Sequence, residues 1–282
     1  MESRDDGHEC KSNWAGHLRA ALVLQAVLAR FEEHGIAVLP VKGVVTARTL
    51  YEDMALRHSG DVDLRLRRTD YRRAIRLARA LGWSPRKGTP VLWQTVLTLM
   101  GCEVDIECTL GPPGLCAISV DDLLRRAQGD RTLFGFPVRT IDLHDHALVL
   151  ALNAYKDWFS CLPWSLEDLR RIVRVPGFEP SILVQRAREG RISSVLWLVA
   201  DWLVREKGVT DWQVVRDGIG AGAPSRRVAH TCGWLRQLGS PPKLGLVATA
   251  SSSDASWRAA IGASLAVAGA CRGRAERALG YF

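Results

Sequence analysis

The sequence predicts an α+β fold, in which a small mixed sheet with helices is followed by a helical half. Helix-like and strand-like apolar patterns alternate up to about residue 140. A turn-rich stretch, Gly111-Pro112-Pro113-Gly114, then interrupts the alternation. From Asp142 onward nearly every apolar pattern has the helical period. We therefore expect a flexible N-terminus over 1–15, an α+β domain over 16–140 and a helical domain over 141–282.

The elements follow from local patterns. Apolar residues at helical spacing predict a helix over 18–31 that stops at His34-Gly35. Alternating polar and apolar residues predict strands over 61–66 and 102–108. Similar patterns predict further strands over 36–41, 91–100 and 134–138, and helices over 44–51, 69–81, 142–159, 166–173, 180–189, 193–205 and 257–279.

The composition excludes some classes of protein. The 282 residues are 47% hydrophobic and 24% charged, which excludes a wholly disordered chain. The formal net charge is +8, and 32 of the 38 basic residues are arginine. Such a surface permits an anionic partner, although arginine-rich composition is also typical of GC-rich genomes. No apolar segment is long enough to span a bilayer, and the seven cysteines include no CxxC pair. We expect a cytoplasmic protein with no membrane contact.

Acidic residues recur on two predicted strands. Alternation places Asp61 and Asp63 on one face, opposite Val62 and Leu64. Close carboxylates repel one another, so such a pair is solvated, protonated or bridged by a cation such as Mg²⁺. The second acidic strand, Glu103-Val104-Asp105-Ile106-Glu107, can supply a third carboxylate if the two strands are neighbours. The alternative is that these acids form only the solvated face of a sheet, although Asp is disfavoured inside strands.

Three motifs together resemble a known family. They are Lys42-Gly43 after an apolar strand, the run from Arg57-His58-Ser59-Gly60 into Asp61-Val62-Asp63-Leu64, and the acidic strand over 103–107. In this order they are similar to the bacterial family of uncharacterised nucleotidyltransferases, within the polymerase-β-like superfold. The stretch Trp164-Ser165-Leu166-Glu167-Asp168-Leu169 resembles a further motif of the helical half.

The resemblance implies a nucleotidyltransferase domain over 16–140, with the helical domain on the acceptor side. Asp61, Asp63 and Asp105 would be catalytic and bind Mg²⁺, with Mn²⁺ as an alternative, while Glu103 and Glu107 would be accessory. Glu107 stands where the family usually has histidine, which changes the proton chemistry of that position. The expected NTP-binding residues are Lys42, Gly43, Arg57, Ser59, Gly60 and Lys156.

Two of these residues also have alternative roles that do not involve NTP. Arg57 either binds phosphate, holds the loop before Asp61 or forms a surface ion pair, and Lys156 either meets phosphate or lies on an exposed helix face. The pair His144 and His146 lies at a predicted helix start, where we expect capping or surface roles rather than metal binding.

The expected function is transfer of NMP from an NTP, with ATP as the expected nucleotide, and release of pyrophosphate. A small-molecule or protein acceptor is favoured, and RNA is left open. The alternative is a non-catalytic nucleotide-binding or RNA-binding regulatory protein on the same fold.

Overall fold

The computed structural model describes residues 5–89, 93–111, 114–157, 159, 163–220, 222, 252–255, 258–261 and 264. Contacts divide the chain into two compact units. The first comprises Met1–Cys108 and Val120–Asp142, and the second comprises Thr109–Ser119 and Leu143–Phe282.

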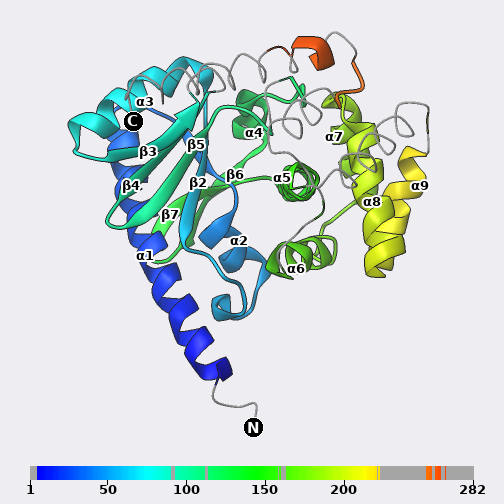
Figure 1. Cartoon of the computed structure of the whole chain (residues 1–282), viewed down its shortest axis with the longest axis horizontal. Coiled ribbons are helices and arrows are strands. Elements are labelled where there is room, and N and C mark those ends of the chain that lie inside the picture. The colour runs from blue at the N-terminus through cyan, green and yellow to red at the C-terminus, as the bar shows by residue number, and fades with distance from the viewer. Residues whose placement is uncertain are drawn as a thin grey trace, which may run out of the picture. The chain divides into compact units, whose positions relative to one another are not determined.

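The first unit contains the sheet and its helices (Figure 1). Its elements in chain order are α1 (Asp5–Glu33), β1 (Val38–Pro40), α2 (Gly43–Leu50), η1 (Met54–Leu56), β2 (Asp61–Leu66), α3 (Arg68–Ala80), β3 (Ser84–Thr89), β4 (Gln94–Leu99), β5 (Cys102–Glu107), α4 (Val120–Arg126), β6 (Gln128–Leu133) and β7 (Phe136–Thr140).

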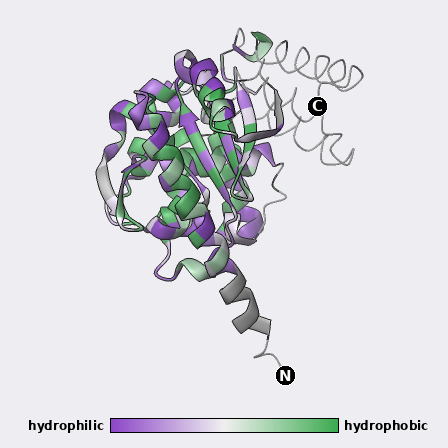
Figure 2. Ribbon diagram, turned by 90° about the vertical axis from the view of Figure 1, so that its left-hand side faces the viewer, coloured by the Kyte–Doolittle hydropathy of each residue, from purple (hydrophilic) through white to green (hydrophobic). Residues whose placement is uncertain are grey.

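Five strands form a mixed sheet in the order β1-β2-β5-β4-β3. The strands β2 and β5 are parallel, and the other neighbouring pairs are antiparallel. One face of the sheet is apolar and belongs to the core, to which β2 contributes Val62, Leu64 and Leu66. Hydrophobic and hydrophilic residues alternate along the strands in Figure 2, as the two-residue period of a strand requires.

Two helices cover the apolar face of the sheet. From α1 the core takes Val23, Leu24 and Val27, and from α3 it takes Tyr71 and Ala74. The helix α1 begins at Asp5, so helical backbone covers most of the segment 1–15 that we expected to be flexible. The predicted helix over 18–31 is confirmed as part of this longer helix.

The edge strand β3 is absent from the sequence prediction. Its sequence, Ser84-Pro85-Arg86-Lys87-Gly88-Thr89, contains two residues that strands disfavour. Proline is tolerated there because β3 pairs on one side only, and the register with β4 shifts between Pro85 and Lys87. Strand β6 was also unpredicted, and it pairs with β7 in a separate two-stranded sheet.

The second unit is helical over its described residues. Its elements are α5 (Leu143–Lys156), α6 (Pro163–Ile172), α7 (Pro180–Glu189), α8 (Ser193–Lys207), η3 (Thr210–Trp212) and α9 (Gln213–Ile219). Trp212 is fully buried and donates its indole N–H to the Leu169 carbonyl at 2.8 Å. Most of the predicted helix over 257–279 lies outside the described residues.

The surface role expected for His144 and His146 is wrong, because both side chains are buried in α5. The Nε2 atom of His144 accepts a hydrogen bond from the Glu179 backbone N–H at 2.9 Å, and the ring stacks on Phe178. A buried imidazole needs such a partner for its polar nitrogen. This histidine is therefore a structural part of the helical unit.

Across the part of the chain that the structure describes, no helix has both the length and the apolar character needed to cross a membrane.

Candidate active site

The acidic residues of β2 and β5 lie side by side on the polar face of the sheet. In the parallel register Asp61 lies opposite Glu103, and Asp63 lies opposite Asp105. Since side chains alternate along a strand, all four point away from the apolar core. The neighbouring-strand condition that the sequence left open is therefore met.

Lys42 joins this cluster from the start of α2. Its Nζ lies 2.7 Å from Asp63 Oδ1, and both side chains are largely buried. Burial has the largest single effect and lowers the pKa of Lys42, but the carboxylates of Asp63 and Glu107 together outweigh it and raise that pKa above its usual value. The structure thus places a positive charge of the chain itself against one of the expected metal-binding carboxylates.

The charged form of Asp105 is disfavoured by its surroundings. Burial, followed by the carboxylates of Glu107 and Asp63, raises the pKa of Asp105 to about 6. Gln94 of β4 lies 3.4 Å from Asp105 Oδ2, whereas the buried Oδ1 atom has no hydrogen-bond partner among the described residues. A buried carboxylate oxygen without a partner is costly, so this atom is available to a proton or a cation.

Asp61 is the exposed member of the cluster. Loss of hydration on its inner side, followed by the Asp63 carboxylate, raises the pKa of Asp61. Lys42 and Arg57 act in the opposite direction. Asp61 therefore binds a proton more readily than an isolated aspartate does.

Glu107 is placed differently from the other acids. Its Oε2 lies 2.5 Å from Arg65 Nη2 in an ion pair whose side chains are both buried. Gln94 also donates to Glu107 Oε1 at 2.9 Å. Glu107 thus neutralises Arg65 and anchors Gln94, while Glu103 pairs with Arg86 on the exposed side of the strand. Both accessory acids are engaged by arginine.

The segment before β2 wraps the N-terminus of α2. Arg57 is buried and donates from Nη1 to the Gly43 carbonyl at 3.0 Å. This geometry favours the loop-holding role of Arg57, and its expected surface ion pair is wrong because the residue is 6% exposed. Ser59 is buried beside Gly43, with no hydrogen-bond partner for its Oγ among the described residues, and Gly60 is exposed.

Gly43 is required by both its backbone and its surroundings. Its φ of +56° lies in the left-handed region, and a Cβ there would lie 2.9 Å from the Asp61 carbonyl oxygen. The N-cap residue Lys42 makes no side-chain cap to α2. The first-turn N–H groups of α2 therefore start beside the carboxylates without a capping side chain, which is a suitable arrangement for an anion.

Helix α1 holds the same segment from the other side. The Nε2 atom of His17 donates to the Arg57 carbonyl at 2.7 Å, and Asn13 donates to the Ala55 carbonyl at 2.9 Å. Burial lowers the pKa of His17, so its ring is neutral near pH 7. At Gly16 a Cβ would lie only 2.8 Å from the Ser59 carbonyl oxygen, which shows how closely the helix approaches the loop.

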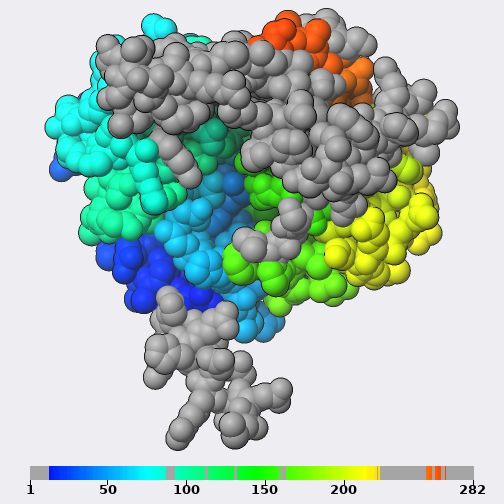
Figure 3. All heavy atoms as spheres, viewed as in Figure 1, coloured from blue at the N-terminus to red at the C-terminus, as the bar shows by residue number. Residues whose placement is uncertain are grey.

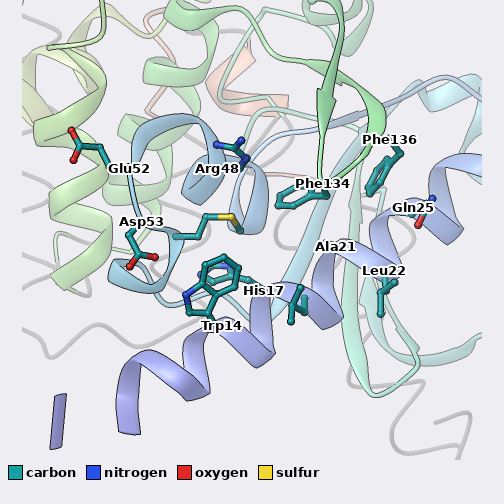
Figure 4. A pocket seen from close by; sticks show the side chains of 12 residues that line it. Trp14, His17, Ala21, Leu22, Gln25, Arg48, Glu52, Asp53, Phe134 and Phe136 are labelled. Carbon is teal, nitrogen blue, oxygen red and sulfur yellow. The ribbon is translucent and has the colours of Figure 1, made fainter. Parts of the chain in front are cut away.

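A cavity of about 620 Å³ opens beside this contact (Figure 4). Trp14, His17 and Leu22 of α1 line it together with Phe134 and Phe136 around the β6–β7 turn. None of the carboxylates of β2 or β5 contributes to its lining. The cavity is therefore separate from the acidic cluster, although His17 contributes to both environments.

Lys156 is the last residue of α5 and belongs to the second unit. Its side chain is partly exposed. Its expected contact with phosphate remains a prediction.

The aspartates of β2 and β5 are candidate ligands for Mg²⁺, which binds carboxylate oxygens. Within the described residues, no group of three or more His, Cys, Asp or Glu side chains is already arranged to hold a metal ion. The chemistry of the set nevertheless fits a hard cation, since Asp61, Asp63 and Asp105 offer carboxylate oxygens and Asp105 Oδ1 is unpartnered. Lys42 already forms an ion pair with Asp63. Its ammonium must therefore move away or share that carboxylate before the three aspartates can bind one cation.

Sequence reasoning missed several residues that shape the site. Strand alternation already places Arg65 on the face of Asp63, so its pairing with Glu107 had a readable signal. No pattern in the sequence indicates the roles of Gln94 and His17, because each depends on a contact between segments that are distant in sequence.

Comparison with known proteins indicates the family of the chain. No curated protein matches the chain significantly. Among solved structures, the chain is similar to the solution structure of the antibiotic-resistance factor ANT(2'')-Ia, with 14% identity and a TM-score of 0.42. That similarity covers 76% of this chain and 96% of the other. The model of a family described as uncharacterised nucleotidyltransferase matches residues 8–205. Because this match spans most of the sequence, the chain belongs to that nucleotidyltransferase family.

Proposed function

We propose that the protein is a Mg²⁺-dependent enzyme that transfers NMP from an NTP, with ATP as the first candidate, to a small-molecule or protein acceptor. The observation that carries this proposal is the β2–β5 register, which sets Asp63 opposite Asp105 beside the N-terminus of α2. An acceptor oxygen would bond to the α-phosphorus as the bond to the bridging oxygen of the β-phosphate breaks. Pyrophosphate would leave with that electron pair, and the acceptor proton would pass to Asp105 or to water.

The residues of the site would divide this work. Asp61, Asp63 and Asp105 would hold Mg²⁺, which when bound would neutralise charge on the triphosphate. The N–H groups that begin α2 and the ammonium of Lys42 would bind phosphate oxygens. Arg57 would keep the α2 N-terminus in place through the Gly43 carbonyl. Acceptor recognition would belong to the helical domain over 141–282, with 16–140 as the nucleotidyltransferase domain.

A ligand-coupled melting experiment tests the site. Mg²⁺ and ATP together should raise the melting temperature of the wild-type protein by on the order of 5 °C when ATP is well above its dissociation constant. The double variant Asp61→Asn/Asp63→Asn should lose this coupling. Asp121→Asn removes an exposed carboxylate of the same unit, one that pairs with Arg67, and should keep it. An equal metal-dependent rise in the double variant would refute the site assignment.

A non-catalytic nucleotide-binding role is the second candidate. The contact between Lys42 and Asp63 favours it, because a carboxylate already paired at 2.7 Å is less available to a metal. Both candidates predict nucleotide binding, whereas only the enzyme predicts pyrophosphate release. Measuring pyrophosphate and melting temperature on the same samples separates them.

A further inference from the structure

One helix of the first unit carries an unusual charge pattern. The 13 residues of α3, Arg68–Ala80, include five arginines and one acidic residue, Asp70. All five arginines are exposed at the surface. Cyan-coloured residues of this part of the chain form part of the surface at the upper left of Figure 3. Four of them lie on one helix face at positions 68, 72, 76 and 79, and we call these the α3 arginine stripe.

The stripe differs from four other arginine-bearing helices, α4, α6, α7 and α8. Arg125, Arg170, Arg186 and Arg205 each have a carboxylate of their own helix three or four residues away as an ion-pair partner. In the described chain, Arg72, Arg76 and Arg79 have no carboxylate partner, and Arg68 instead lies over the Trp93 ring, 4.7 Å from its centroid. The stripe therefore presents positive charge that no carboxylate of the described residues neutralises.

This arrangement is unfavourable for the helix alone. Like charges four residues apart repel one another along a helix, and the pairs 68/72 and 72/76 have this spacing. Arg68 also lies in the first turn, where the helix dipole disfavours a cation. An external polyanion would relieve both effects.

The stripe lies away from the carboxylates. On its inner side α3 contributes Tyr71, Ala74 and Ala78 to the core that also holds Leu64 and Ile106. These strand residues alternate with Asp63 and Asp105, so α3 covers the face of the sheet opposite the acidic cluster. The stripe is therefore a surface separate from the proposed transfer site.

We infer that the α3 arginine stripe binds the phosphodiester backbone of a nucleic-acid strand. The planar guanidinium group matches phosphate oxygens in pairs, and successive arginines of the stripe are about 4.5 to 6 Å apart along the axis. Between Arg68 and Arg79 every large apolar side chain is at least partly buried. The stripe thus lacks the exposed apolar groups by which a basic helix enters a membrane. Contacts of this kind carry charge complementarity without base recognition.

The test is a salt titration with a fluorescent 12-nucleotide single-stranded RNA and the DNA of the same sequence. Four phosphate contacts predict that affinity falls about 50-fold between 50 and 200 mM salt, because each contact on a single strand contributes a slope of about 0.7. The triple variant Arg72→Gln/Arg76→Gln/Arg79→Gln should bind more weakly and lose only about threefold affinity over the same range. Its melting temperature should equal or exceed that of the wild type, since repulsion is removed.

The matched control is Arg125→Gln/Arg174→Gln/Arg205→Gln, which changes the net charge equally but removes arginines paired with Asp122, Asp211 and Asp201. It should keep the wild-type salt slope. Equal weakening of both triple variants would show a bulk charge effect and overturn the inference. Tighter binding to poly-glutamate or to phosphatidylserine vesicles than to either strand would overturn it as well. Preference between RNA and DNA would show which strand the stripe serves.

Discussion

Gly43 links the start of α2 to the acidic strand β2 through one close approach. Replacing it with alanine adds a Cβ 2.9 Å from the Asp61 carbonyl oxygen and 3.4 Å from Asp61 Oδ1. We expect Gly43→Ala to destabilise the protein by about 1 to 3 kcal/mol and to abolish the melting shift with Mg²⁺ and ATP.

Gly35→Ala is the matched control, since Gly35 has a φ of +62° but open space around it. Gly35→Ala should lower the free energy of unfolding only through backbone strain, and it should keep the melting shift with Mg²⁺ and ATP. Chemical denaturation together with ligand-coupled melting measures both quantities. A Gly43→Ala variant that still responds to nucleotide would contradict the assigned loop.

Asp105 should make stability depend on pH. Its pKa in the folded protein, about 6, lies above the ordinary value of 3.8, so the folded state binds this proton more tightly than the unfolded state. The contribution of Asp105 to the free energy of unfolding therefore falls as pH rises from about 4 through 6, by on the order of 3 kcal/mol.

Asp105→Asn removes this loss. We expect the variant to be more stable than wild type at pH 8, with the difference shrinking towards pH 4. Urea unfolding of both proteins across this range gives the comparison. A variant that is less stable than wild type at pH 8 would contradict the electrostatic description of Asp105.

Glu107 is predicted to stabilise the fold through Arg65. Glu107→Gln leaves the buried guanidinium without its counter-charge and should cost about 3 to 5 kcal/mol. Glu107→His should cost as much for the same reason. The double variant Arg65→Met/Glu107→Leu removes both charges and should recover much of the loss. Single variants as stable as wild type in urea unfolding would refute this role.

At the scale of elements, α1 acts as the support of the loop that precedes β2. His17→Leu removes the hydrogen bond to the Arg57 carbonyl and should weaken Mg²⁺-ATP binding roughly fivefold, since one such bond contributes about 1 kcal/mol. His17→Gln restores a donor and should recover part of the affinity. Leu18→Ala changes the next residue, whose side chain is 59% exposed, and serves as the control. Calorimetric titration checks the prediction, and equal affinity in all variants would contradict it.

The strands that carry the acids were predictable because each alternates cleanly between polar and apolar residues. The observed β2, Asp61–Leu66, has the predicted bounds, and β5 ends one residue before its predicted end. Strand β3 was not predictable, since Pro85 and Gly88 violate strand preference and are tolerated only at a sheet edge. The support from His17 was invisible for another reason. It depends on a contact between residues 40 positions apart, which no local pattern encodes.

At the scale of the whole molecule, the residues proposed for metal and nucleotide binding gather in one unit, apart from Lys156. Asp61, Asp63, Asp105, Lys42 and Arg57 all belong to the unit that includes the sheet. The net charge of +8 therefore coexists with a local acidic cluster, and within the described residues the stripe on α3 is a part of it without carboxylate partners. A basic protein with an acidic site suits a phosphate-rich substrate held through a cation.

The proposed transfer of a nucleotidyl group is tested by tracing the α-phosphorus of the NTP. The protein is incubated with Mg²⁺ and each common NTP labelled at the α-phosphate, with and without an extract of its source cells. We predict covalent label on the protein or on one extract component, matched by pyrophosphate release and absent from Asp61→Asn/Asp63→Asn. Binding of labelled NTP with neither covalent transfer nor pyrophosphate release, for every nucleotide, would contradict the claim.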